Sequence, residues 1–231
     1  MNTKVQSTML EIMLLIIGIA SGSCFVAFHY SLPLVVRITL KIIPIAMMCV
    51  WILSRNLDKY NWGIFVGLLF AILGDITMEL NGDIIFIVGV VLNMLALVFY
   101  TIYFIRSDRS LKILRLIPFL AIMSIVYIVI FKNLGIYKIP IFIYDILYAV
   151  FLWRSSARLG DKQISVLSQW VCFIGCVIIT TSDSLLGLSL FKPNHYIFDS
   201  YFVTMALWWM GQLMMAITAV TSPEFAGDQN L

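Results

Sequence analysis

The sequence predicts an all-α polytopic membrane protein, a bundle of eight transmembrane helices. Of its 231 residues, 62% are hydrophobic and 12% are charged, and the mean hydropathy is +1.02. Soluble domains carry about 25% charged residues, so a chain this apolar has to face lipid rather than water. The apolar residues gather in runs of about 20, the length that crosses a bilayer as a helix.

Eight such runs follow one another, separated by turn-forming stretches. In order, these breaks are "YSLP", "RNLDKYN", "NGD", "RSDRS", "KNLG", "RLGDK" and "KPNH". Because the breaks are short, we expect one transmembrane domain over residues 1–221 and a polar, disordered tail over 222–231. The expected helices cover residues 8–30, 33–54, 61–80, 83–105, 111–131, 138–157, 166–188 and 198–221.

The first run has some features of a secretion signal, because Lys4 precedes an apolar stretch that ends in "IASGS". The apolar run continues through "CFVAFHY", however, which makes it long enough to span the membrane. We therefore expect the first run to be a transmembrane helix.

Loop charge predicts the orientation of the chain. Only Lys132, Lys138 and Lys192 fall on one side of the predicted topology. Cytoplasmic loops carry the excess of Lys and Arg, so both termini are expected in the cytoplasm. The richer side holds ten basic residues: Lys4, Arg55, Lys59, Arg106, Arg109, Lys112, Arg115, Arg154, Arg158 and Lys162.

Composition also argues against several classes of function. A net charge of +3 is too small to suggest nucleic-acid binding. Two histidines, His29 and His195, form no metal-binding pattern, which argues against a zinc hydrolase. The four cysteines lie in apolar runs with no metal or redox spacing, and they are expected to be packing residues. We therefore expect neither a metal nor another cofactor.

Charged residues within the helices fall at one depth. A charge inside the membrane costs about 3 kcal/mol or more, so it usually faces the bundle interior. With the predicted orientation, the charges lie roughly 5–12 Å below the outer boundary, at 1.5 Å per helical residue. They belong to four separate helices and are Arg37, Lys41, Asp75, Glu79, Asp145 and Asp183.

These charges have two readings. Arg37 and Lys41 are four residues apart, as are Asp75 and Glu79, so each pair shares one helix face. A structural network of salt bridges would explain that spacing. The acids outnumber the bases, however, so some carboxyl is expected to lack a cation, as acid–base catalysis often requires.

A weak internal repeat surrounds two of the acids. A glycine stands eight residues before each acid and a small residue directly before it: Gly67, Gly74 and Asp75, then Gly175, Ser182 and Asp183. The two segments lie four helices apart, which is compatible with two four-helix halves related by an axis along the membrane normal. Small residues also simply permit close helix packing.

Other polar side chains in the helices are candidates for lining a pocket. Asn93 and Gln212 would either line it or hydrogen-bond across helices as glue. Tyr144, Tyr148 and Tyr201 lie near the level of the charges, although tyrosines also populate the membrane interface.

The segments "GLLFAILGDITME" and "TTSDSLLGL" resemble the two signature segments of the YhhN-type lysoplasmalogenase family. "KIIP" resembles a third segment, and "WWMGQLMMA" resembles the family's last helix, with Gly211 where alanine is usual. The resemblance implies an enzyme that hydrolyses the vinyl-ether bond of lysoplasmalogen. The products would be a fatty aldehyde and glycerophosphoethanolamine or glycerophosphocholine. The residues that the motifs carry over are Lys41, Asp75 and Asp183.

We therefore expect Asp75 and Asp183 to be catalytic, without a metal or cofactor, because vinyl-ether cleavage resembles glycoside hydrolysis by two carboxyl groups. The expected partners are a lysophospholipid and the bilayer, in the endoplasmic reticulum of a eukaryote or the inner membrane of a bacterium. The expected substrate-binding residues are Lys41, Arg37, Glu79, Asp145, Asn93, Tyr148 and Gln212.

A proton-coupled transporter of lipids or small molecules is the alternative, because intramembrane acids beside bases also form proton relays. Transporters typically bind near the midplane through broken helices. Here the charges lie in the outer half, and the acid-bearing runs are unbroken. A purely structural or sensory membrane protein is a third reading.

The charge asymmetry predicts cytoplasmic N- and C-termini. A reporter that is active only in the cytoplasm, fused after Leu231, should therefore be active. Activity of a reporter that works only on the outer or lumenal side would contradict the orientation and the depth argument with it.

Overall fold

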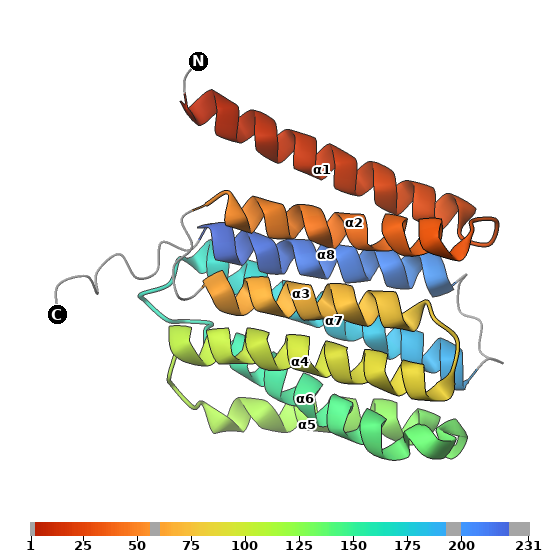
Figure 1. The fold of residues 1–231 in the computed structure, drawn as a ribbon. Helices are drawn as coiled ribbons and strands as arrows, with labels where there is room; N and C mark the ends of the chain where they lie inside the picture. The colour runs from red at the N-terminus through yellow and green to blue at the C-terminus, as the bar shows by residue number, and fades with distance from the viewer. Residues whose placement is uncertain (1–2, 56–60, 193–199, 222–231) are drawn as a thin grey trace.

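Eight long helices that alternate in direction form one bundle (Figure 1). The computed structural model describes residues 3–55, 61–192 and 200–221. These residues contain no strand, and their eight helices are long and apolar enough to cross a membrane, as predicted. The helices are α1 (Thr3–Phe28), α2 (Leu34–Leu53), α3 (Asn61–Met78), α4 (Asp83–Ser107), α5 (Leu116–Ile130), α6 (Lys138–Ala157), α7 (Val166–Phe191) and α8 (Ser200–Thr221).

Several helices differ from their expected bounds by a few residues; α1, expected over 8–30, is Thr3–Phe28. The helix expected over 111–131 begins as a 3₁₀ turn, Ile113–Arg115, before α5 proper, and ends in a second, Phe131–Asn133. Helix α7 continues three residues beyond 188, to Phe191, because the first helix-breaking residue after Leu188 is Pro193. The tail over 222–231 and His195 lie outside the described residues.

The end of the bundle where α1, α3, α5 and α7 finish is called the distal end here, on the right in Figure 1. At this end the turn between α3 and α4 contains Gly82 with φ +126°, a conformation that favours glycine. Both ends of the described chain, Thr3 and Thr221, lie at the opposite, proximal end.

At the proximal end, basic side chains around the last turn of α6 donate hydrogen bonds to backbone carbonyls. Arg154 donates to the carbonyls of Asp108 and Ser110. Arg115 and Lys112 donate to carbonyls in that last turn. Cations here satisfy carbonyls that lack a helical partner and oppose the negative end of the helix dipole.

Helices α1 and α5 lie at the two edges of the bundle, and the other six surround a shared core (Figure 1). In this interior, α2 packs on α3 and α8, while α6 packs on α4 and α7. The closest pairings are α3 with α4 and α7 with α8. The bundle therefore repeats one arrangement of helices in its two halves, α1–α4 and α5–α8.

Small residues allow the closest approach in the first half. A Cβ atom at Gly67 would stand 2.2 Å from the Tyr100 ring, and one at Gly74 would stand 2.5 Å from Asn93 Oδ1. Only a residue without a side chain fits at either position, so α3 meets α4 directly over these glycines.

The second half uses the corresponding positions in α7. A Cβ atom at Gly175 would stand 2.8 Å from Met214 Cβ. Ser182 Oγ donates to the carbonyl oxygen of Thr204 at 2.8 Å. The weak repeat in the sequence thus corresponds to equivalent helix contacts beside the two aspartates.

Gly67→Ala should destabilise the bundle by about 2 kcal/mol, the scale of core overpacking. Tyr100 is fully buried and donates a hydrogen bond of 2.7 Å to Gln212, so its ring has little freedom to yield. Denaturant unfolding in detergent measures the loss.

Gly18→Ala is the matched control, because its new Cβ would meet Pro44 at an ordinary 3.6 Å. It should be neutral or slightly stabilising, as alanine favours helix over glycine. Equal stability of the two variants would contradict the packing argument.

Candidate active site

Four charged side chains meet where α2 and α3 approach the distal end. Glu79, one residue beyond α3, accepts hydrogen bonds from Arg37 Nε at 2.6 Å and Lys41 Nζ at 2.9 Å. Lys41 Nζ also lies 3.7 Å from Asp75 Oδ1. The i,i+4 spacing of both pairs is what lets them face each other across the two helices.

A proline shapes α2 next to this cluster. Pro44 has no N–H to donate to the carbonyl of Leu40, four residues earlier. Ser21 Oγ of α1 donates to that carbonyl instead, at 2.8 Å. The next carbonyl, that of Lys41, accepts a bond from Trp209 Nε1 of α8 at 3.3 Å. Side chains of α1 and α8 therefore hydrogen-bond to the α2 carbonyls next to the proline, which fixes the backbone of Lys41.

Helix α8 completes the cluster. Trp208 Nε1 donates to Asp75 Oδ2 at 3.0 Å, and Tyr201 OH donates to Glu79 Oε1 at 2.9 Å. These two donors are seven residues apart, so they share one face of α8. Both carboxylates thus have a cation and a neutral donor beside them.

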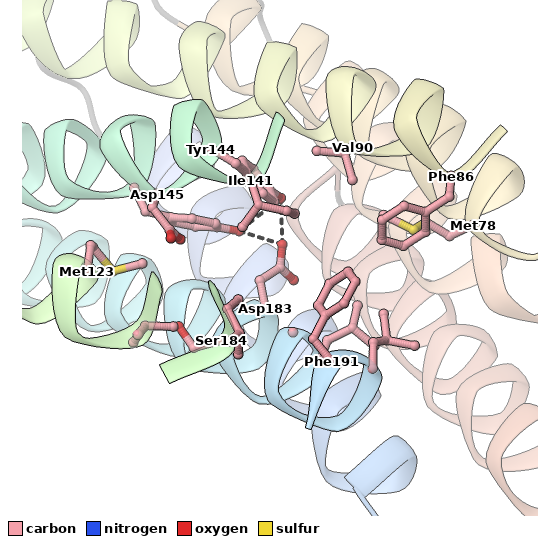
Figure 2. A pocket seen from close by; sticks show the side chains of 16 residues that line it. Met78, Phe86, Val90, Met123, Ile141, Tyr144, Asp145, Asp183, Ser184 and Phe191 are labelled. Carbon is pink, nitrogen blue, oxygen red and sulfur yellow. Dashed lines mark hydrogen bonds between the residues drawn. The ribbon is translucent and has the colours of Figure 1, made fainter. Parts of the chain in front are cut away.

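Asp183 has different surroundings. Its Oδ2 accepts hydrogen bonds from Tyr144 OH at 2.5 Å and Tyr148 OH at 2.6 Å, and the two hydroxyls lie 3.1 Å apart (Figure 2). Both tyrosines come from one face of α6. Within the described part of the chain, Asp183 makes no ion pair of 4 Å or less.

The two aspartates are close enough to influence each other. Asp75 and Asp183 interact electrostatically, and Lys41 interacts with both. Like charges near one another in a desolvated site share protons unequally. The arrangement therefore holds one carboxyl beside a cation and a second beside neutral hydroxyls.

Asp183 opens onto a cavity between α4, α5, α6 and α7 (Figure 2). Its volume is about 50 Å³. Aliphatic, aromatic and methionine side chains form most of the wall, and the polar groups are those of Asp183, Tyr144, Tyr148, Asp145 and Ser184. Such a lining suits an apolar chain with a few oxygen atoms.

The predicted site residues fall into three places. Asp145, Tyr148 and Asp183 line this cavity. Arg37, Lys41, Asp75 and Glu79 form the neighbouring charged cluster and are not among its lining residues.

Asn93 and Gln212 lie in the core instead. Gln212 accepts the bond from Tyr100 OH, and Asn93 packs against Gly74. Neither residue lines the cavity. Trp208, which donates to Asp75, is not among the residues predicted for the site, because an indole in an apolar run looks like an ordinary core residue.

A larger cavity lies between α1, α2 and α8, with a volume of about 330 Å³. Its wall is almost wholly apolar, with Glu11 and Ser23 as exceptions. None of the acidic or basic residues of the cluster lines it. Cavity size alone therefore does not indicate where chemistry occurs.

Glu79 lies just beyond the membrane-spanning segment of α3. Burial alone would raise the pKa of its carboxyl, but Lys41, Tyr201 and Arg37 stabilise the charged form and hold the pKa below its ordinary value. Glu79 is therefore an ionised partner that keeps Arg37 and Lys41 in position. Among the described residues, no three His, Cys, Asp or Glu side chains are grouped to hold a metal ion.

Comparison with known proteins gives one match. A family model described as the YhhN family matches residues 36–219. The matched region includes both aspartates and the charged cluster, and it leaves out α1, residues 29–35 and residues 220–231. No curated protein and no solved structure is matched by the chain.

Glu79→Gln should destabilise the protein by about 3 kcal/mol at neutral pH, because it leaves two cations without their shared carboxylate. A lowered pKa in the folded state adds stability above the ordinary value of 4.5, which is lost as pH falls through the folded value. The difference from wild type should therefore be full at pH 7 and shrink below pH 4.5.

Thermal unfolding in detergent at several pH values measures this difference. Glu11→Gln is the control, because Glu11 pairs with the exposed Arg55 and such surface pairs contribute less than about 1 kcal/mol. A Glu79→Gln variant as stable as this control at pH 7 would show that the cluster does not hold the helices together.

Proposed function

The chain belongs to the YhhN family, and from this membership and the surroundings of its two aspartates we propose that it hydrolyses the vinyl-ether bond of lysoplasmalogen. The products are a fatty aldehyde and the glycerophospho-alcohol that carried it. One observation supports this reaction above others: Asp183 enters an apolar cavity while a second carboxyl, Asp75, lies nearby beside Lys41.

Vinyl-ether hydrolysis needs a proton donor more than a nucleophile. A proton added to the β-carbon converts the vinyl ether into an oxocarbenium ion, which water then captures at the α-carbon. Glycoside hydrolysis passes through a similar cation and uses a protonated carboxyl with an ionised one. A pair of carboxyl groups with unlike neighbours suits this chemistry.

The unlike neighbours suggest unlike roles. Asp75 lies 3.7 Å from the Lys41 ammonium and accepts a bond from Trp208, so it is the natural carrier of negative charge. Among the described residues Asp183 has no cation within 4 Å, and it opens onto the cavity, so we assign it as the proton donor. The charge of Asp75 also stabilises the positive charge that develops in the cavity.

In the proposed reaction, Asp183 gives its proton to the β-carbon and becomes a carboxylate. A water molecule forms a bond to the α-carbon and returns a proton to Asp183, which yields a hemiacetal. The bond between the α-carbon and the ether oxygen then breaks as that oxygen gains a proton and the hemiacetal hydroxyl loses one. One water is consumed, and the enzyme returns to its starting state.

The cavity and the charged cluster suit an amphiphilic substrate. Met78, Phe86 and Val90 offer an apolar wall for the alkenyl chain. Arg37 is 26% exposed through its side chain and contacts Glu79 through Nε. Its terminal nitrogens are suited to hold the lipid phosphate, a group that guanidinium binds in a bidentate manner.

Purified protein in detergent should release fatty aldehyde from lysoplasmalogen. Asp183→Asn should reduce turnover at least a hundredfold, the scale of a lost general acid. Asp75→Asn should cause a similar loss, and the double variant should be hardly worse than either, because groups that act together are not additive. Aldehyde release and thermal unfolding are measured together.

Asp161→Asn, in the connection between α6 and α7, is the control and should retain normal turnover. Near-normal turnover in folded Asp183→Asn would exclude this mechanism. The assay also separates the proposal from a proton-coupled transporter, because a transporter needs two compartments and produces no aldehyde in detergent.

A further inference from the structure

Asp145 is a buried carboxyl that the proposed mechanism does not use. It is 9% exposed, and its Oδ2 has no hydrogen-bond partner among the described residues. Leaving a buried polar atom without a partner costs about 1–3 kcal/mol. A ligand that supplies a donor at this atom would recover that cost.

Asp145 lies next to Tyr148, which hydrogen-bonds to the proposed proton donor, Asp183. Asp145 comes three residues before Tyr148 on α6, so the two side chains are neighbours on one helix surface. Tyr148 OH in turn lies 2.6 Å from Asp183 Oδ2. Asp145 and Asp183 line the same cavity from different helices (Figure 2).

Asp145 also borders a second hollow. A groove between α5 and α6 shares Asp145 and Met123 with the cavity, so these two side chains stand between them. Several residues of the groove are exposed on the outside of the bundle, where lipid would lie, among them Ile128, Phe142 and Ile146. An amphiphile that enters from the membrane between α5 and α6 therefore meets Asp145 before Asp183.

The chemistry of a lysolipid supplies the donor that this site lacks. A lysoplasmalogen carries a free hydroxyl on the glycerol carbon next to the one that bears the vinyl-ether oxygen. A hydroxyl this close to the reacting bond has to lie in the cavity when the bond is beside Asp183. The phosphate and its headgroup lie further along the molecule, beyond this hydroxyl.

We propose that Asp145 accepts a hydrogen bond from the free sn-2 hydroxyl of the substrate and thereby selects lysolipids over lipids acylated at that position. The proposal rests on the function proposed above. A site built to pair a substrate hydroxyl rejects an analogue without it strongly, because the buried protein group is then left unpaired. An acyl group at sn-2 would both remove the donor and occupy the space beside Asp145.

Binding of non-hydrolysable ligands tests this role separately from catalysis. The ligands are a saturated 1-O-alkyl lysophosphocholine and its 2-deoxy analogue, titrated against full-length protein in detergent by calorimetry. Wild type should bind the hydroxyl ligand at least about tenfold more tightly, the value of one hydrogen bond to a charged group. Equal affinities for the two ligands in wild type would overturn the proposal.

Variants identify the residue responsible. Asp145→Leu should bind the two ligands with equal affinity, whereas Asp145→Asn keeps an acceptor oxygen and should retain at least a threefold preference. Ser124→Ala changes a polar group on the groove side of Asp145 and should retain the full preference. An unchanged preference in Asp145→Leu would also overturn the proposal. Both apolar and amide replacements should fold, because they remove an unpaired buried carboxyl.

Measuring aldehyde release as well as binding distinguishes the proposed reaction from the proposed role of Asp145. If wild type selects the hydroxyl ligand through Asp145 but releases no aldehyde, the proposed reaction is wrong and the hydroxyl site remains. If wild type releases aldehyde but binds both ligands equally, the reaction remains and the role of Asp145 is wrong.

Discussion

A charge inside a bilayer has to be paired or hydrogen-bonded, and this constraint organises the distal half of the bundle. Arg37 and Lys41 on α2 meet Glu79 and Asp75 on and beyond α3, and α8 adds an indole and a phenol to the two carboxylates. These contacts join the consecutive helices α2 and α3 to α8, which is distant from them in the sequence. The proline of α2 adds to the arrangement, because the carbonyls around it are bonded by α1 and α8.

The two halves of the bundle use the same packing to hold different chemistry. In each half a small residue directly precedes an aspartate and contacts the following helix, Gly74 in α3 and Ser182 in α7. The preceding helix brings Lys41 to the first acid and a tyrosine pair to the second. A nearly symmetrical framework thus gives two identical side chains unlike neighbours, which is what a division into proton donor and charge carrier requires.

The two edge helices, α5 and α1, border different cavities. Helix α5 contributes Met123 to the cavity wall and borders the groove that reaches Asp145, so it stands between the membrane and the second acid. Helix α1 covers the apolar cavity against α2 and α8, away from both acids. The groove between α5 and α6 therefore extends from the outer surface of the bundle to the wall of the cavity.

The sequence alone determined the class of the protein, the number and order of its helices and the end of the bundle toward which its intrahelical charges gather. Apolar runs of spanning length and the cost of intramembrane charge act locally along the chain, so they can be read without knowing which helices touch. The equivalence of the segments around Asp75 and Asp183 was also visible, since spacing on a helix decides which residues share a face.

Only the tertiary structure decided which of these residues share a cavity. Asn93 and Gln212 look like pocket residues in the sequence but lie in the core, where Gln212 pairs with Tyr100. Trp208 looks like a core residue but donates to Asp75. Partnership depends on the rotation of each helix about its axis and on its neighbours across the bundle, and both follow from packing between distant segments rather than from local spacing.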